Sequence, residues 1–429
     1  MSLVLTILAF GIMITIHELG HFLVARAFGV QIETFSLGFG KPIFNIERGG
    51  TNYRLSWLPL GGYVKMKEEN PDEEASGQQD SFKSKTWWQR ALIAFAGPFA
   101  NLILAILIFI VSFLLPQRLE DSRPVISQVE GIWASKLLPG DSLALVNGKA
   151  VRGFGEAMYL LNPVRENDLR IVRQDKLYSL KVPGAEKDSL ISSLQPVAEA
   201  IVGDVSPGYP AWRAGLRGGD RITSVDSVQV TDWYQMRELI IGSKNPSVLL
   251  QISRGDSLLS RRINLEANIL DNQNTRMIGI TQYQPVRYTH HYPVDVAIGN
   301  GFVTSYNMIL MNYYGLYRLF QKPESIKSNL GGPVMMVSMS QSVGAKGFGS
   351  LLLFFGGISL ILMIMNLLPI PILDGGQIMF CLIEGIFRRP LPLRVQEIAQ
   401  RIGFSLLIML MAFAFYSDIQ KLVLRLISS

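Results

Sequence analysis

The residues that could do chemistry stand together near the start of the chain, as His17-Glu18-Leu19-Gly20-His21. On a helix, two residues four apart share one face and lie one turn from each other. Two neutral imidazoles at this spacing can hold Zn²⁺, and the neighbouring carboxylate of Glu18 can accept a proton from the water that the ion activates. The spacing therefore predicts a zinc hydrolase site, with His17 and His21 as ligands, Glu18 as general base and a third ligand still to be found.

The surroundings of this motif sharpen the prediction. The motif lies inside an apolar run from Leu3 to Phe28, which is long enough to cross a membrane. A charged side chain at the centre of a bilayer costs roughly 2.5 to 3.5 kcal/mol on insertion scales, so ionisable groups there usually have a function. The alternative is a helix end whose polar side chains only reach the lipid headgroups. The spacing and the apolar enclosure together favour the metal site.

Composition excludes several other classes of protein. Hydrophobic residues make up 48% of the 429 residues and charged residues only 17%, which indicates that part of the chain lies in lipid. The net charge of +6 is spread over several loops without a basic block, so we expect no nucleic-acid partner. The single cysteine, Cys381, allows neither a disulfide within the chain nor a multi-cysteine metal site. The N-terminal run lacks the basic start and cleavage site of a removable signal peptide, and we interpret it as a retained span.

The apolar runs predict a polytopic α-helical membrane protein with four transmembrane helices. Basic residues concentrate in the connection after the first run, which places that loop in the cytosol and the N-terminus outside. The expected segments are a first helix at 1–29, a cytosolic loop at 30–90, a second helix at 91–115, two extracytoplasmic β-rich domains at 116–196 and 197–286, an interfacial helix and linker at 287–347, a third helix at 348–387, and a cytosolic loop with the fourth helix at 388–429.

A break in the third apolar run offers the third ligand. The run contains Asn366-Leu367-Leu368-Pro369-Ile370-Pro371-Ile372-Leu373-Asp374, and its two prolines must open the helix. An open helix at membrane depth is tolerated only beside protein or a water-filled cavity, which makes Asp374 the first candidate. With four spans, the first and third run in the same direction and bring the histidines and Asp374 to similar depth. Glu384 is the alternative ligand, if the protein is a membrane zincin of another family.

Two further stretches could support the site. In residues 41–66, apolar and polar side chains alternate on both sides of the turn Arg48-Gly49-Gly50-Thr51. This pattern predicts a β-hairpin with enough apolar content to dip toward the membrane. Its exposed edge could pair with an extended substrate, or the hairpin could simply face solvent. In the second span, Gly97 and Asn101 are four apart and offer a small and polar face for close helix packing, which packing alone could explain.

The region between the second and third spans contains two similar strand-rich units. The second unit carries Ala214-Gly215-Leu216-Arg217-Gly218-Gly219-Asp220, which resembles the signature of PDZ domains, whereas the first has Lys136-Leu137-Leu138-Pro139 at the corresponding place. PDZ domains bind peptides by strand addition, so this tandem either inspects substrates or obstructs access to the site.

Taken together, the motifs resemble the site-2 protease family of intramembrane zinc metalloproteases, most closely its bacterial RseP type, over nearly the whole chain. The resemblance is carried, in the family order, by 17–21, 36–40, 59–66, 97–101 and 366–375. It implies Zn²⁺ as cofactor, with His17, His21 and Asp374 as ligands and Glu18 as general base. It also implies substrate-positioning roles, which we assign to Asn366, Pro369, Pro371 and Asn101.

The resemblance also implies a function, namely regulated intramembrane proteolysis. The expected substrates are single-pass membrane proteins such as anti-sigma factors, already trimmed by an upstream site-1 protease, and remnant signal peptides. The expected location is the bacterial inner membrane, with the N-terminus and PDZ region extracytoplasmic and the active site toward the cytosol. The hairpin would hold an unwound substrate helix, and the PDZ tandem would exclude bulky substrates. The remaining alternative is a non-enzymatic PDZ receptor or metal-handling protein, in which Glu18 would be dispensable.

Overall fold

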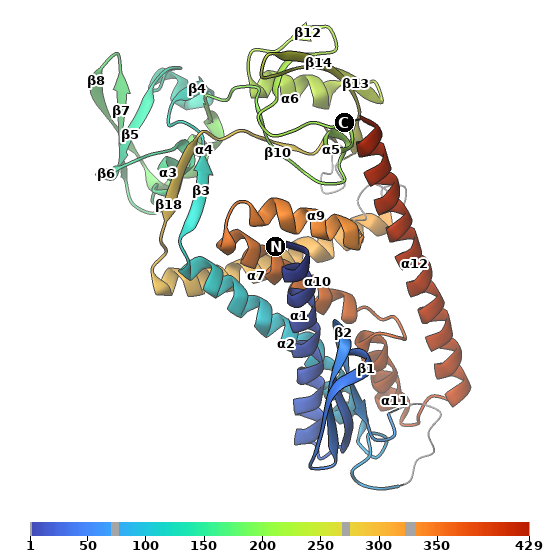
Figure 1. Cartoon of the computed structure of the whole chain (residues 1–429). Helices are drawn as coiled ribbons and strands as arrows, with labels where there is room; N and C mark the ends of the chain where they lie inside the picture. Colours follow the sequence, from blue (N-terminus) through green and yellow to red (C-terminus); the bar gives the residue numbers. More distant parts are fainter. Residues whose placement is uncertain (1, 70–76, 268–274, 322–331, 429) are drawn as a thin grey trace. The chain divides into compact units, whose positions relative to one another are not determined.

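The computed structural model describes residues 2–69, 77–267, 275–321 and 332–428. The chain divides into two compact units (Figure 1). One contains the long apolar helices and the first pair of strands, and the other consists mainly of Arg118–His290. We call them the helical unit and the strand-rich unit.

Among the described residues, four helices are long and apolar enough to cross a membrane, as the sequence predicts. They are α1 (Ser2–Ala27), α2 (Trp87–Leu114), α10 (Phe348–Asn366) and α12 (Leu393–Ser428). Two of them begin earlier than expected. Helix α2 starts at Trp87 because Gln89 Oε1 accepts hydrogen bonds from the backbone N–H and the hydroxyl of Thr86, which closes the first turn. Helix α12 starts directly after Pro392, so it fills nearly all of the segment 388–429 in which a loop and the fourth helix were expected.

Helix α2 is the centre of the helical unit. It packs against α1, α10, α11 (Asp374–Phe387) and α7 (Val294–Gln321) (Figure 1). A Cβ at Gly20 of α1 would overlap the carbonyl of Ala96, so the glycine lets the backbones of α1 and α2 approach closely. Helix α2 therefore has one face directly against the helix that carries the two histidines.

Helix α7 differs from the four candidate spans. Its Ser305 side chain is buried and donates to the carbonyl of Gly301, whereas Phe302 and Tyr306 are exposed. This distribution agrees with a helix that lies on the membrane surface, and that placement stays a prediction. Helix α9 (Pro333–Gly344) follows, and residues 322–331 of the predicted linker lie outside the described residues.

The predicted break in the third apolar run is present. Helix α10 ends at Asn366 and α11 begins at Asp374, so the expected single third helix is two helices joined by a proline-containing segment. Glycines make the turn possible, because a Cβ at Gly375 would overlap the carbonyl of Leu368 and one at Gly376 would overlap that of Ile370.

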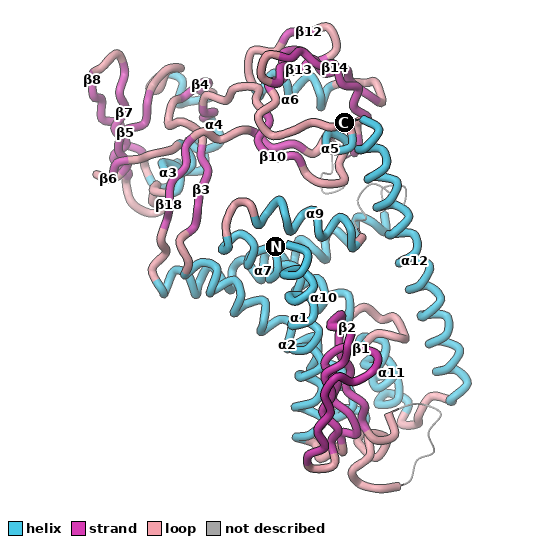
Figure 2. Tube along the Cα trace, viewed as in Figure 1, coloured by secondary structure: helices cyan, strands magenta, loops and turns pink. Residues whose placement is uncertain are grey.

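The predicted hairpin is larger than expected. Strand β1 (Ile32–Arg48) and strand β2 (Thr51–Met66) are joined at Gly49-Gly50, and both bend (Figure 2). Strand β1 bends at Gly38 and Gly40, which have φ of +89° and +91°. Residues 32–37 pair with 62–66 on one side and with 52–55 on the other, and 52–56 pair in turn with 42–48. The result is an antiparallel sheet of four short segments, whose two edges are 62–66 and 42–48.

The strand-rich unit contains two modules whose four-stranded sheets have the same strand order. In each, a four-stranded sheet is accompanied by one helix that follows its second strand in the sequence. The first module has the order β6-β5-β7-β8 (Lys149–Ala150, Ser142–Val146, Asn167–Arg173, Lys176–Val182) with α3 (Phe154–Tyr159). The second has β12-β11-β13-β14 (Val228–Gln229, Arg221–Val225, Ser247–Arg254, Ser257–Asn264) with α6 (Trp233–Gly242).

Short strands complete these modules. Strand β4 (Ile126–Val129) pairs with β9 (Leu194–Pro196), and β10 (Val202–Val205) pairs with β17 (Ile280–Gln282). Strand β3 (Gln117–Asp121) pairs with β18 (Val286–His290), so the start and the end of the region are joined.

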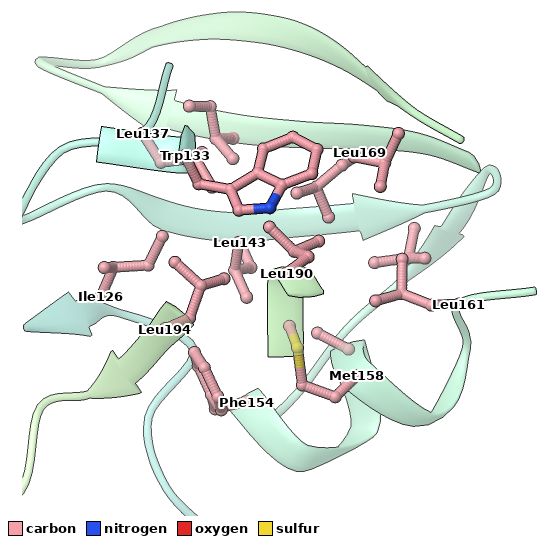
Figure 3. Close-up of a cluster of buried hydrophobic side chains, with 14 residues drawn as sticks. Ile126, Trp133, Leu137, Leu143, Phe154, Met158, Leu161, Leu169, Leu190 and Leu194 are labelled. Atoms are coloured by element: carbon pink, nitrogen blue, oxygen red, sulfur yellow. The ribbon is translucent and has the colours of Figure 1, made fainter. Parts of the chain in front are cut away.

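Each module has its own apolar core. In the first, Trp133 is fully buried among side chains that include Leu137 and Leu190 (Figure 3). Leu137 lies four residues before Asp141, as Leu216 lies four before Asp220, and both leucines are buried. The first module therefore keeps the buried leucine of the repeat, and its departures at Leu138 and Pro139 fall on exposed positions.

Candidate metal centre

The two histidines lie together on α1, as their spacing predicts. Their Nε2 atoms are 3.2 Å apart, and both residues are buried. The rings meet edge to face with 4.8 Å between their centroids. A pair of imidazoles with converging Nε2 atoms is what two ligands of one metal ion require.

The break between α10 and α11 brings Asp374 to the histidines. Asp374 is the first residue of α11, and its Oδ2 lies 3.1 Å from Nε2 of His17. Its Oδ1 lies 3.5 Å from Nε2 of His21. Within the described ranges, these three residues form the group whose ligand atoms could hold a metal ion. Glu384, the alternative third ligand, instead forms an ion pair with Arg90 of α2 and does not join this group.

The polar atoms of this group fit a cation. Nδ1 of His21 lies 2.7 Å from the carbonyl oxygen of Ile93, which can only accept, so Nδ1 carries the proton and Nε2 presents a lone pair. Oδ2 of Asp374 is buried and accepts no hydrogen bond. A lone pair of His21 and the carboxylate of Asp374 thus face one another beside Nε2 of His17, an arrangement that a Zn²⁺ ion would satisfy.

Gly97 of α2 makes room for the imidazole rings. A Cβ at this position would overlap Nε2 of His21 and lie 2.8 Å from Cε1 of His17. The helix backbone therefore forms the wall against which both rings rest.

Glu18 lies beside the group without joining it. Its Oε2 accepts a hydrogen bond from the backbone N–H of Val64 at 3.1 Å. Val64 belongs to the edge segment 62–66, and Gly62 in the same segment lies close to Cγ of Glu18. The predicted general base is thus next to both the three ligands and a sheet edge.

The four residues predicted to position substrate do not lie in one place. Asn366 ends α10, and Pro369 and Pro371 lie in the break. Pro371 and Asp374 line a cavity of about 460 Å³ together with Glu69, which gives the site a polar opening. Asn101 lies elsewhere, against the far side of His17, with its Nδ2 3.4 Å from Nδ1 of the ring.

Sequence reasoning missed the groups that support the site from behind. The carbonyl of Ile93 and the N–H of Val64 belong to the backbone, so residue type carries no signal for them. Gly97 was visible as a packing residue spaced four from Asn101 and as part of the motif 97–101, but neither signal showed that it makes room for the imidazole rings.

Comparison with known proteins identifies the family. The model of peptidase family M50 matches residues 5–410. The regulator of sigma-E protease RseP from Salmonella typhimurium is 32% identical, over 97% of this chain and 98% of that protein. The protein of the same name from Escherichia coli K12 gives the same identity and coverage.

Two further similarities are more distant or more local. A Neisseria meningitidis protein whose name describes a zinc metalloprotease is 29% identical, over 98% of this chain and 99% of its own length. Among solved structures, the PDZ domain of a SdrC-like protein from Listeria innocua is 27% identical, covering 22% of this chain and 99% of that one with a TM-score of 0.18.

The family match covers all three candidate ligands. It also covers the first three candidate transmembrane helices and ends at residue 410, within the fourth. It confirms the resemblance inferred from the motifs and excludes the non-enzymatic alternative. The chain belongs to peptidase family M50 and is a site-2-type intramembrane zinc metalloprotease.

Proposed function

We propose that this peptidase cuts single-pass membrane proteins within their transmembrane segment, at a zinc site formed by His17, His21 and Asp374. The observation that carries the proposal is the convergence of three ligand atoms, contributed by an apolar helix and by a break between two others. Ionisable groups in an apolar membrane helix cost free energy, so their presence there usually indicates a function.

The zinc ion, when bound, supplies Lewis-acid polarisation of the scissile carbonyl and activation of the attacking water. Glu18 acts as the general base, accepts the proton from that water and then donates it to the leaving amine. Its hydrogen bond from Val64 orients the carboxylate, and the cavity lined by Glu69 and Asp374 admits water.

A substrate helix must unwind before it can be cut, because a helical peptide bond is shielded by its own hydrogen bonds. The edge segment 62–66 lies beside Glu18 and offers backbone groups with which an unwound strand can pair. An apolar cavity of about 260 Å³, lined by residues such as Ile16 of α1, Leu37 of β1 and Leu55 of β2, would take apolar side chains of the substrate. We assign Asn366, Pro369 and Pro371 to positioning the strand from the other side.

The relatives suggest which substrates these are. The similar Salmonella and Escherichia coli proteins both carry the name regulator of sigma-E protease RseP. We propose membrane-anchored regulators of the anti-sigma factor type, pre-trimmed by an upstream site-1 protease, as substrates here, and remnant signal peptides as a second group. The two PDZ-like modules would exclude untrimmed substrates by size.

The orientation follows from the positive-inside rule. The basic residues between α1 and α2 place that connection in the cytosol. We propose that the protein lies in the bacterial inner membrane with its N-terminus and modules extracytoplasmic and the metal centre toward the cytosolic side.

The test is cleavage of a trimmed single-pass substrate in liposomes by the wild type and by Glu18→Gln, with bound zinc quantified in both. We expect the wild type to cut inside the substrate span and the variant to retain zinc but lose cutting by at least about a hundredfold, the range of a lost general base. Glu166→Gln, at an exposed ion pair with Lys181 in the first module, is the control and should cut the trimmed substrate normally. Equal cutting by wild type and Glu18→Gln would refute this role.

A further inference from the structure

One face of α2 supports both histidines from behind. Ile93, Gly97 and Asn101 are spaced four apart, so they lie on one face of the helix. Ile93 offers its carbonyl to His21, Gly97 gives the rings room, and Asn101 reaches His17. Ile93 and Asn101 thus contact the two histidines at Nδ1, the ring nitrogen that points away from the metal position.

The contact to His21 is complete as it stands. Its Nδ1 donates to the carbonyl oxygen of Ile93 over 2.7 Å, which fixes the tautomer with a lone pair on Nε2. This is the usual arrangement of a metal-binding histidine, whose second nitrogen donates to an acceptor.

His17 lacks such an acceptor at its Nδ1. Nδ2 of Asn101, a donor, lies 3.4 Å from Nδ1 of His17. Oδ1 of Asn101 is buried and has no hydrogen-bond partner, and the residue is only 1% exposed. If Nε2 of His17 binds a metal, Nδ1 carries the proton, and two donors would then face each other.

A half-turn of the Asn101 amide removes this conflict, because it exchanges the positions of oxygen and nitrogen with almost no change in shape. We propose that Asn101 is a positioning residue of the metal centre, whose Oδ1 accepts the Nδ1–H of His17 and so fixes the tautomer and ring orientation of that ligand. This inference rests on the proposed zinc site, and it replaces the substrate-positioning role that the sequence suggested for Asn101.

The experiment measures zinc affinity rather than activity. The full-length protein in detergent is titrated with zinc against a competing chelator, as wild type, Asn101→Leu and Asn101→Asp. Leucine has nearly the shape of asparagine but accepts no hydrogen bond, so Asn101→Leu should weaken zinc binding by about 10- to 100-fold. Aspartate can only accept, so Asn101→Asp should keep the wild-type affinity or exceed it.

The control is Ser112→Ala, which removes another buried polar contact of α2. The Ser112 hydroxyl donates to the carbonyl of Gly349 on α10 and touches no candidate ligand. This variant should bind zinc as the wild type does. The absorption bands of bound Co²⁺ give a second readout, which should change in Asn101→Leu and remain nearly as in the wild type in Asn101→Asp.

Three results would overturn the inference. One is unchanged zinc affinity in Asn101→Leu. Another, which still decides the matter if the leucine variant does not fold, is a tenfold or greater loss in Asn101→Asp, because that would mean that Asn101 acts as a donor. The third is an equal loss in Ser112→Ala. Failure of the proposed zinc site would look different, since wild type and His17→Ala would then bind zinc equally weakly.

Discussion

The candidate metal centre and the two modules both bury an aspartate, but they surround it differently. In the two modules, Asp141 and Asp220 are each paired with an arginine, Arg173 and Arg254, at 2.7 Å. Each aspartate also accepts a backbone N–H from three residues earlier in the chain. In the helical unit, Asp374 faces two imidazole nitrogens, and its Oδ2 accepts no hydrogen bond.

The difference separates a structural carboxylate from a functional one. A buried carboxylate whose partners are all present stabilises the fold around it, and removing it leaves an unpaired charge. A buried carboxylate that lacks a partner is held in place by the surrounding fold and is ready for a ligand. Exchanging each aspartate for asparagine should therefore have opposite consequences in the two units.

The largest effect is expected at Asp374. Asp374→Asn should weaken zinc binding by roughly a thousandfold, about 4 kcal/mol, because three ligands share a binding free energy on the order of 10 kcal/mol. The melting temperature of the zinc-free protein should stay the same or rise, since lone pairs no longer face one another. Chelator competition and a thermal melt in detergent measure both quantities.

Glu384→Gln is the control for this substitution. It removes the carboxylate that pairs with Arg90 and should leave zinc affinity unchanged while lowering the melting temperature. Loss of zinc in Glu384→Gln, with retention in Asp374→Asn, would reverse the assignment of the third ligand.

A smaller effect is expected in the second module. Asp220→Asn should cost about 2 to 3 kcal/mol of module stability, at the low end for a broken buried pair because Arg254 is partly exposed. Hydrogen exchange of β11 and β13 in the full-length protein should accelerate, with zinc affinity unchanged. Glu199→Gln, in a half-exposed pair with Arg221 of the same module, is the control and should change exchange little. Normal protection in Asp220→Asn would show that the pair is dispensable.

The smallest effect is a pH dependence of the first module. Burial by itself would raise the pKa of Asp141, but hydrogen bonds from Arg173 and from the N–H of Leu138 outweigh it and hold the pKa below its ordinary value. Because the folded-state pKa is the lower one, the stabilisation is complete above the unfolded-state pKa of about 4 and is lost as pH falls through the folded-state value. Exchange protection of β5 and β7, corrected for the intrinsic rate, should therefore decrease below about pH 4.

Arg173→Met tests the sign of this effect. Without the guanidinium, burial dominates and raises the pKa of Asp141, so acidification should increase protection in the variant. The same acid response in both proteins would show that Arg173 is not the cause.

The sequence was sufficient to predict which three candidate ligands come together and the break that positions Asp374. His17 and His21 were predictable because their spacing and apolar surroundings rarely occur together without function, and Asp374 because prolines open a helix at that depth. The choice between Asp374 and Glu384 needed the structure. Glu384 forms an ion pair with Arg90, which is distant from it in the sequence. The substrate-positioning role of Asn101 stays a prediction; the contact with His17, on which we base a different proposal, could not be predicted, since a motif cannot show which side of a ligand an amide touches.

The fold was predictable in outline, but several boundaries were not. The two modules were visible as a repeat, and the departure in the first is explained by Leu137, which keeps the buried side chain. The first segment of β1 was missed because its inward positions include Thr34 and Ser36, which hide the alternation of a strand. Its glycines, which bend the strand, also suggested a loop.

The order of the candidate ligands along the chain has a consequence for biosynthesis. The histidines lie on α1, which leaves the ribosome before both modules, whereas Asp374 follows only after them. A nascent chain that has inserted α1 and α2 has the two histidines of the metal centre but lacks the carboxylate of Asp374. With the proposed ligands, hydrolysis requires Asp374, so we expect a chain truncated before α11 to be inert and activity to arise only after the modules that would screen substrates have been made.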